Sequence, residues 1–308
     1  MADVPFDMAG KVADEFIELL EATGVDLKAH SQTEGDALAM MQVLEIWRGR
    51  AAMPKDPRAV IRAALGFVDL AGKLLAVKGH SDFDQLRPHL MNLASGSVLQ
   101  NRFAPVTDAV SNKMAELYIA SLVMSFASNV VVDHPDRSKG DNPDVMFTFR
   151  GRPWAIAVKT LASKRNARSI YDNIKYGSDQ IQVSDADFGL IVINLKNVLD
   201  HDALWPQLDG PIEEEMARNE LNSQISEIVS SLSEIPESDW ALAFGPDRKA
   251  EPPILFLAQG VSFVVRSTDG GRYLMPMKFF STYLDAKKDS HGGVKLAHTL
   301  NDAMQSLI

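Results

Sequence analysis

One stretch of eight residues, FGLIVINL at 188–195, constrains the fold of this chain more than any other. It is continuously apolar, which is typical of a β-strand buried on both faces. The chain has 308 residues, of which 46% are hydrophobic and 23% charged, a globular composition that suffices for one large domain or two ordinary ones. We therefore expect a protein of the α/β (α+β) class around a buried sheet.

The residues before this strand alternate between helical and extended patterns. A helix that Thr107 or Asp108 can cap is followed by three short strands, and a second helix with an apolar face leads into the buried strand. The expected order is α-β-β-β-α-β, over residues 107–127, 130–132, 144–149, 154–161, 169–183 and 188–195.

The two ends of the chain differ from this middle part. Residues 1–105 are predicted to form a helical N-terminal region, and residues 106–308 an α/β domain with its core at 107–200 and a C-terminal extension at 201–308. In the extension, helices are expected at 213–232 and 294–307, and a hairpin is expected from 254–258 and 261–265. Whether the extension continues the central sheet or stands apart remains open at the sequence level.

Several classes of protein are excluded by composition. There is no cysteine, so disulfides and thiolate metal sites are ruled out and a reducing compartment is favoured. The N-terminus lacks the pattern of a secretory signal, and the longest apolar stretch, at 117–132, is shorter than the roughly 20 residues of a membrane span. The sequence therefore predicts a cytoplasmic protein that does not cross a membrane.

The charges are unevenly distributed. The formal net charge of −10 argues against a generally basic nucleic-acid binder, but residues 133–175 carry nine basic and five acidic residues. Basic side chains at a hairpin tip and in the following loop could hold a phosphate backbone, although a solvated loop is the simpler alternative. The candidates for binding nucleic acid are Arg150, Arg152, Lys164, Arg165 and Arg168.

Two charged residues flank the hairpin NPDVMFTFRGRPWAIAVKT at 142–160. If the turn is centred between the second and third residues of RGRP, Phe149 faces Trp154 and Asp144 faces Lys159. A cross-strand ion pair at a sheet end is the simpler interpretation. A functional site needs a further partner, and Glu116 in the preceding helix shares its face with small residues that let it approach the sheet.

The α-β-β-β-α-β order, the pair Pro143-Asp144 and the apolar strand ending in Lys159 resemble the PD-(D/E)XK restriction-endonuclease-like superfamily over about residues 107–200. The resemblance implies a restriction-endonuclease-like core that hydrolyses phosphodiester bonds in nucleic acid with Mg²⁺ or Mn²⁺. DNA is favoured over RNA as the partner, but the sequence leaves this choice open. It also implies roles for individual residues. Asp144, Glu116 and the backbone carbonyl of Val158 would bind the metal, and Lys159 would position or polarise the attacking water.

Two positions depart from the family pattern. Gln180 matches a contact to phosphate or metal-bound water, but Tyr176 precedes it by four residues, the reverse of the family's order. Position 157, where the family has Asp or Glu, is Ala157. Either Glu116 acts as the second carboxylate, or the metal binds weakly and the fold is degenerate. In the first case, Ala157→Glu is expected to preserve or raise activity.

Two histidines are weaker candidates. His134 in the loop before the hairpin could be a general base, and His201, between Asp200 and Asp202, could bind a metal. A solvated loop and a helix cap are the simpler interpretations. Sequence motifs for NTPases, α/β-hydrolases and zincins do not occur.

Two functions remain open at this stage. The first is a metal-dependent nuclease, in DNA processing or defence, whose N-terminal helices serve recognition or homo-oligomerisation. The second is a non-catalytic nuclease-like module that binds nucleic acid or a protein partner.

Overall fold

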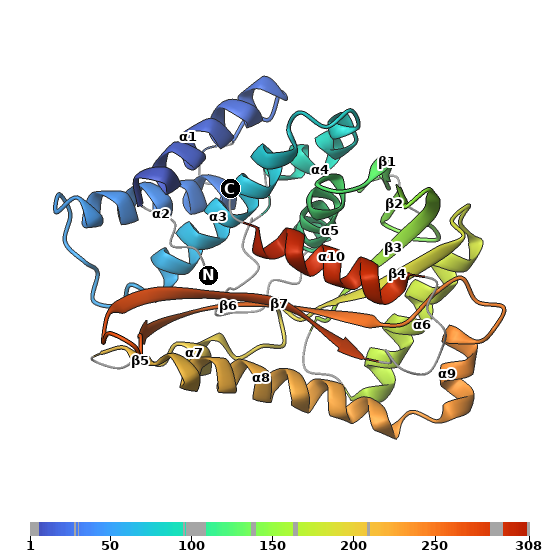
Figure 1. Ribbon diagram of the computed structural model, residues 1–308. Helices are drawn as coiled ribbons and strands as arrows, with labels where there is room; N and C mark the ends of the chain where they lie inside the picture. The colour runs from blue at the N-terminus through green and yellow to red at the C-terminus, as the bar shows by residue number, and fades with distance from the viewer. Residues whose placement is uncertain are drawn as a thin grey trace.

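The computed structural model describes residues 6–27, 29, 31–94, 96, 109–136, 140–162, 166–207, 210–283 and 292–306. In these ranges seven strands form one sheet, and helices cover both of its faces (Figure 1). The predicted mixed α/β class is thus confirmed. Within the same ranges, every helix is too short or too polar to cross a membrane.

The described part of the N-terminal region consists of helices and the turns that connect them. Its elements are α1 (Phe6–Ala22), α2 (Gln32–Trp47), α3 (Arg58–Val77), the 3₁₀ turn η1 (Phe83–Leu86) and α4 (Arg87–Asn92). The predicted boundary between residues 105 and 106 lies outside the described residues.

The middle part follows the expected order and lies in one sheet. Strands β1, β2 and β3 form an antiparallel meander, and β4 pairs with β3 in parallel. The bounds differ from the prediction by at most three residues at either end: α5 (Ala109–Met124), β1 (Ser128–Val132), β2 (Val145–Phe149), β3 (Arg152–Thr160), α6 (Ala167–Val183) and β4 (Phe188–Asn194).

The C-terminal extension continues the central sheet. The strand order is β1-β2-β3-β4-β6-β5, with β7 paired to β6. The elements are α7 (His201–Leu204), β5 (Ile212–Glu213), α8 (Glu214–Ser231), the 3₁₀ turn η2 (Leu232–Glu234), α9 (Glu237–Phe244), β6 (Ile254–Val265), β7 (Arg272–Tyr283) and α10 (Gly293–Gln305).

The predicted hairpin of 254–258 and 261–265 is wrong. Both segments belong to the single strand β6, which pairs with β7 along its whole length. Gly260 is not a turn residue but a buried strand position, where a Cβ would lie 2.8 Å from Leu204 Cδ1. The glycine serves close packing against α7, which the sequence cannot distinguish from a turn.

Two buried clusters lie on opposite faces of the sheet. On one face, α5 and α10 pack on the strands, and α3 and α1 add further layers behind α5. On the other face, α6 and α8 pack on the strands, and α9 packs beside α6 (Figure 1). Strand β4 contributes to both, with Leu190 and Val192 in the first cluster and Ile191 and Ile193 in the second. The prediction of a strand buried on both faces is confirmed.

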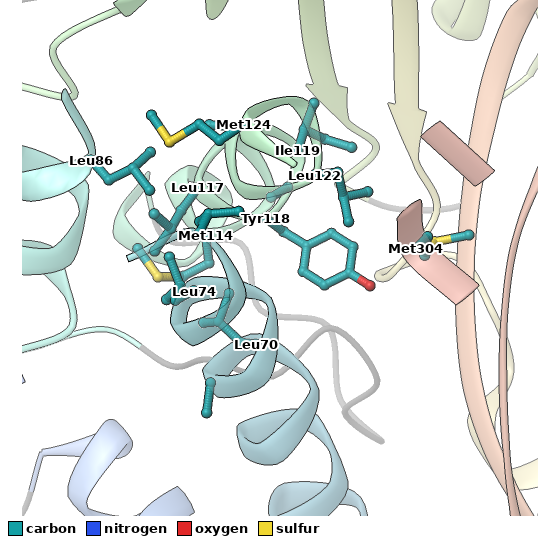
Figure 2. Close-up of a cluster of buried hydrophobic side chains, with 14 of the residues drawn as sticks. Leu70, Leu74, Leu86, Met114, Leu117, Tyr118, Ile119, Leu122, Met124 and Met304 are labelled. Carbon is teal, nitrogen blue, oxygen red and sulfur yellow. The ribbon is translucent and has the colours of Figure 1, made fainter. Parts of the chain in front are cut away.

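The first cluster fixes α5, the helix that carries Glu116. Leu70 and Leu74 of α3 lie beside Met114 and Tyr118 of α5, with Met304 of α10 nearby (Figure 2). A helix held by fully buried side chains on several sides presents its polar residues at fixed positions.

Candidate active site

The β2–β3 hairpin turns one residue earlier than expected. Arg150 and Gly151 both have left-handed backbones, with φ of 52° and 76°, as in a two-residue type I′ turn. Phe149 therefore pairs with Arg152, and the predicted pairing of Phe149 with Trp154 is wrong. The same shift rules out the predicted direct pairing of Asp144 with Lys159.

Asp144 nevertheless reaches Lys159 through its side chain. Its N–H donates to Ile156 O (3.0 Å), and its Oδ2 accepts the N–H of Val158 (2.6 Å). The carboxylate thus takes the place of a backbone acceptor at the end of the ladder. Lys159 Nζ lies 3.6 Å from the same oxygen, and Asp144 is 5% exposed.

Lys159 has two further neighbours. Its Nζ donates to the carbonyl of Val158 (3.1 Å) and lies 5.3 Å from the ring centroid of Tyr176. The ammonium is therefore held between a carboxylate, a carbonyl and an aromatic face, which restricts where it can point.

Glu116 lies on α5 and is 6% exposed. Lys113, one turn earlier, places its Nζ 2.8 and 3.0 Å from the two carboxylate oxygens. His89 Nε2, on α4, lies 3.2 Å from Oε2. Glu116 is therefore a buried acid with two basic partners.

The pKa values of Asp144 and Glu116 are shifted in opposite directions. Burial, followed by the negative charge of Glu116, raises the pKa of Asp144 to about 7, although Lys159 favours its ionised form. Burial also opposes ionisation of Glu116, but the hydrogen bond with His89 and the charge of Lys113 outweigh it, so the pKa of Glu116 is lowered. Glu116 therefore lies near enough to Asp144 to disfavour its ionised form.

Gln180 and Tyr176 hold the loop that leads into Asp144. Gln180 Nε2 and the Tyr176 hydroxyl donate to the carbonyl of Gly140, at 2.6 and 2.5 Å. Gly140 has a φ of 82°, and a Cβ there would lie 2.7 Å from the Tyr176 oxygen. In the described residues, Gln180 therefore positions the loop, whereas the contact to phosphate or metal-bound water stays a prediction.

Ala157 lies in tight packing rather than in an open ligand position. It is fully buried, and a Cβ on Gly177 of α6 would approach its Cβ to 3.3 Å. A glutamate at 157 has no room between β3 and α6 without displacing the helix. We therefore revise the expectation for Ala157→Glu from preserved or raised activity to a destabilised protein.

The basic candidates do not gather at one point. Arg150 and Arg152 are exposed and lie over the rings of Phe149 and Phe188. Arg168, in the first turn of α6, is paired with Asp172 (3.1 Å) and with Asp239. Arg150 and Arg152 lie where β3 begins, whereas Arg168 lies on α6, which follows the other end of that strand. Lys164 and Arg165 lie outside the described residues.

The histidine candidates have structural partners. His134 Nδ1 accepts the N–H of Asp136 (3.2 Å) in a turn. His201 is 2% exposed, its Nε2 lies 3.1 Å from Lys196 O, and burial lowers its pKa to about 4. Asp200 caps α7 by accepting from the N–H groups of Asp202 and Ala203. For His201, the helix-cap interpretation holds.

The donors fit a hard cation that keeps part of its water. Asp144, Glu116 and the Val158 carbonyl offer oxygen atoms, and Mg²⁺ is commonly held by one or two carboxylates with waters and substrate oxygens completing its shell. Among the described residues, no three His, Cys, Asp or Glu side chains are grouped as a metal site. The set therefore suits Mg²⁺ or Mn²⁺ better than a fully protein-bound metal.

Three residues of this site escaped the interpretation of the sequence. Lys113 could have been found from its spacing of three residues before Glu116. Asp133 lies beside Asp144, to whose carbonyl its N–H donates (3.0 Å), and its Oδ2 is buried without a hydrogen bond in the described structure. His89 is far away in sequence, so that no local signal points to it.

A comparison of the chain with known protein families, with curated proteins and with solved structures finds no match. The assignment of a function therefore depends on the site itself.

Proposed function

We propose that the protein is a metal-dependent nuclease that hydrolyses phosphodiester bonds, with a restriction-endonuclease-like core at α5-β1-β2-β3-α6-β4. The observation that supports it best is the meeting of the Asp144 carboxylate, the Lys159 ammonium and the Val158 carbonyl at the end of the β2–β3 ladder, within the electrostatic reach of Glu116. Buried charges are costly, and their concentration at one point is typical of functional sites.

In this proposal, Asp144, Glu116 and the Val158 carbonyl would hold Mg²⁺ or Mn²⁺. The cation supplies stabilisation of phosphate charge and lowers the pKa of a bound water. Lys159, fixed beside Asp144, orients that water or the phosphate by donating a hydrogen bond. Gln180 and Tyr176 keep the loop before Asp144 in place. DNA is the favoured substrate and RNA the alternative.

A specific observation favours a second function. Ala157 is packed against α6, and Glu116 already has Lys113 and His89 as partners. A chain that has lost one acid and neutralised another is consistent with a non-catalytic nuclease-like module that binds nucleic acid or a protein.

A cleavage screen decides between the two. Single- and double-stranded DNA and RNA are incubated with the protein and Mg²⁺ or Mn²⁺, with chelator as a blank. We expect metal-dependent cleavage that Asp144→Asn abolishes, and that Lys159→Met abolishes without loss of metal binding. Lys175→Met, which removes a lysine paired with Asp179 on α6, is the matched control and should cleave normally. No cleavage of any substrate by the wild type would support the non-catalytic module.

A further inference from the structure

Lys113 contacts Glu116, one of the acids of the candidate site. Its Nζ contacts both oxygens of Glu116, at 2.8 and 3.0 Å, and its side chain is 22% exposed. A bidentate contact of this kind orients the carboxylate as well as neutralising it. Within the described residues, Lys113 therefore forms the closest cationic contact of Glu116.

The charge of Lys113 also interacts with acids other than Glu116. Burial alone would lower the pKa of Lys113, but Glu116, and more weakly Asp144 and Asp133, raise it, so that the ammonium form is stabilised. In turn, Lys113 lowers the pKa of Asp144. One ammonium thus serves three carboxylates, which is the electrostatic role that a divalent cation would have there.

Two cations bound to the same carboxylate repel each other. Metal–oxygen distances of about 2.1 Å would bring Mg²⁺ and the ammonium within roughly 5 Å if both bound Glu116 oxygens. In a buried site, water screens such a repulsion poorly. Binding of the metal to Glu116 is then expected to require displacement of the Lys113 side chain, which has a solvent-facing portion toward which it can move.

We propose that the Lys113 ammonium is a built-in counter-ion that competes with a divalent cation for the Glu116 carboxylate, and that Lys113 thereby keeps the affinity of the site for Mg²⁺ or Mn²⁺ low. The inference rests on the proposed function, since it assumes that Asp144 and Glu116 are the metal ligands. It goes beyond that function by assigning Lys113 the control of metal loading.

The test is a calorimetric titration of the full chain with Mn²⁺, without nucleic acid. Lys113→Met keeps the length of the side chain and removes the charge. The Lys113–Glu116 hydrogen bond joins two charged groups and is therefore stronger than a neutral one. Removing it is expected to tighten Mn²⁺ binding by about tenfold or more. Lys113→Gln provides a second neutral side chain should the methionine variant fold poorly, and thermal unfolding reports on both.

Two controls isolate the position of the charge. Lys113→Arg keeps the positive charge and should bind Mn²⁺ as weakly as the wild type. Lys11→Met removes a lysine from an exposed pair with Glu15 on α1, and should leave the affinity unchanged. If Lys11→Met tightened binding as much as Lys113→Met, the effect would be one of net charge and the inference would be overturned.

The remaining outcomes separate the inference from the proposed function. Equal or weaker Mn²⁺ binding by folded Lys113→Met and Lys113→Gln overturns the inference and leaves the nuclease proposal standing. Binding by Lys113→Met but not by the wild type supports the inference and favours the non-catalytic module. Tighter binding that Asp144→Asn does not reduce in the Lys113→Met background places the metal elsewhere, which overturns both.

Discussion

The two ends of the β2–β3 hairpin differ in the kind of side chain that packs there. At the turn end, Phe149 contacts Phe126 and Trp154 with ring centroids 5.7 and 6.3 Å apart, and Trp154 contacts Phe188 at 5.2 Å. At the open end, where β2 begins and β3 ends, charged groups take the place of rings. Asp144 and Lys159 meet there, and Glu116 approaches from α5.

The two ends contribute differently to the stability of the fold. Aromatic side chains gain free energy on burial and require only shape complementarity. A buried carboxylate costs free energy unless it is fully compensated, and Asp144 is so poorly compensated that its pKa rises to about 7. The turn end stabilises the fold, whereas the open end carries a cost in stability, as the proposed function requires of its site.

The largest effect on stability is expected at the turn end. Trp154 is 2% exposed, and Trp154→Ala should lower the free energy of unfolding by about 3–5 kcal/mol, because it removes the ring that joins Phe149 to Phe188. Trp154→Phe, the matched variant, should lose much less. Denaturant unfolding measures both. A loss below about 1 kcal/mol for the alanine variant would remove the contrast between the two ends.

At the open end, Glu116→Gln should destabilise the protein by about 3 kcal/mol at pH 7. The substitution leaves Lys113 and His89 beside a neutral amide in a buried place, and removal of one partner of a buried ion pair is costly. Since the pKa of Glu116 is lowered by folding, its contribution is present above its unfolded pKa and is lost as the pH falls through the folded value. Unfolding of both proteins at pH 7 and pH 3 should show the difference shrinking in acid.

Asp144→Asn should raise the free energy of unfolding, whereas Glu116→Gln should lower it. The folded pKa of about 7 lies above the ordinary 3.8, so ionisation of Asp144 costs stability increasingly as the pH rises between these values. The amide can still accept the Val158 N–H. We expect Asp144→Asn to be about 2–4 kcal/mol more stable than the metal-free wild type at pH 8, with little difference at pH 4. Stability curves that run parallel from pH 4 to pH 8 would contradict a raised pKa.

The smallest expected effect concerns the arginines of the hairpin tip. Arg150→Gln with Arg152→Gln should weaken binding of nucleic acid and reduce the slope of log affinity against log salt by about one for each phosphate that the variant no longer neutralises. Both side chains are exposed, so stability should change little. The measurement is fluorescence anisotropy at several salt concentrations. An unchanged slope would leave the tip a solvated loop.

The sequence predicted the layers better than the details. The apolar run at 188–195 correctly indicated a strand buried on both faces, because such a pattern depends only on which residues avoid water. The turn lies one residue earlier than predicted because Arg150 adopts a positive φ. This conformation is unusual for a residue other than glycine, and the sequence pattern does not reveal it. Register and turn are decided by tertiary packing.

For the candidate site, too, the general placement of residues was predicted better than the details. Asp144 and Lys159 were correctly predicted to lie together, although their contact is through the Asp144 carboxylate rather than through a direct cross-strand pair. The partners of Glu116 could be predicted only in part. Lys113 is within one helical turn, but His89 reaches the acid through the folding of α4 against α5, for which no short-range pattern exists.

The most direct test of the charged end as a metal site is thermal unfolding at pH 8 with and without excess Mn²⁺, for the wild type and Asp144→Asn in parallel. A ligand that binds only the folded state raises its stability. We predict that Mn²⁺ raises the Tm of the wild type and leaves that of Asp144→Asn unchanged, although the variant is the more stable protein without metal. An equal response of the two proteins to Mn²⁺, including none, would contradict a metal site at Asp144.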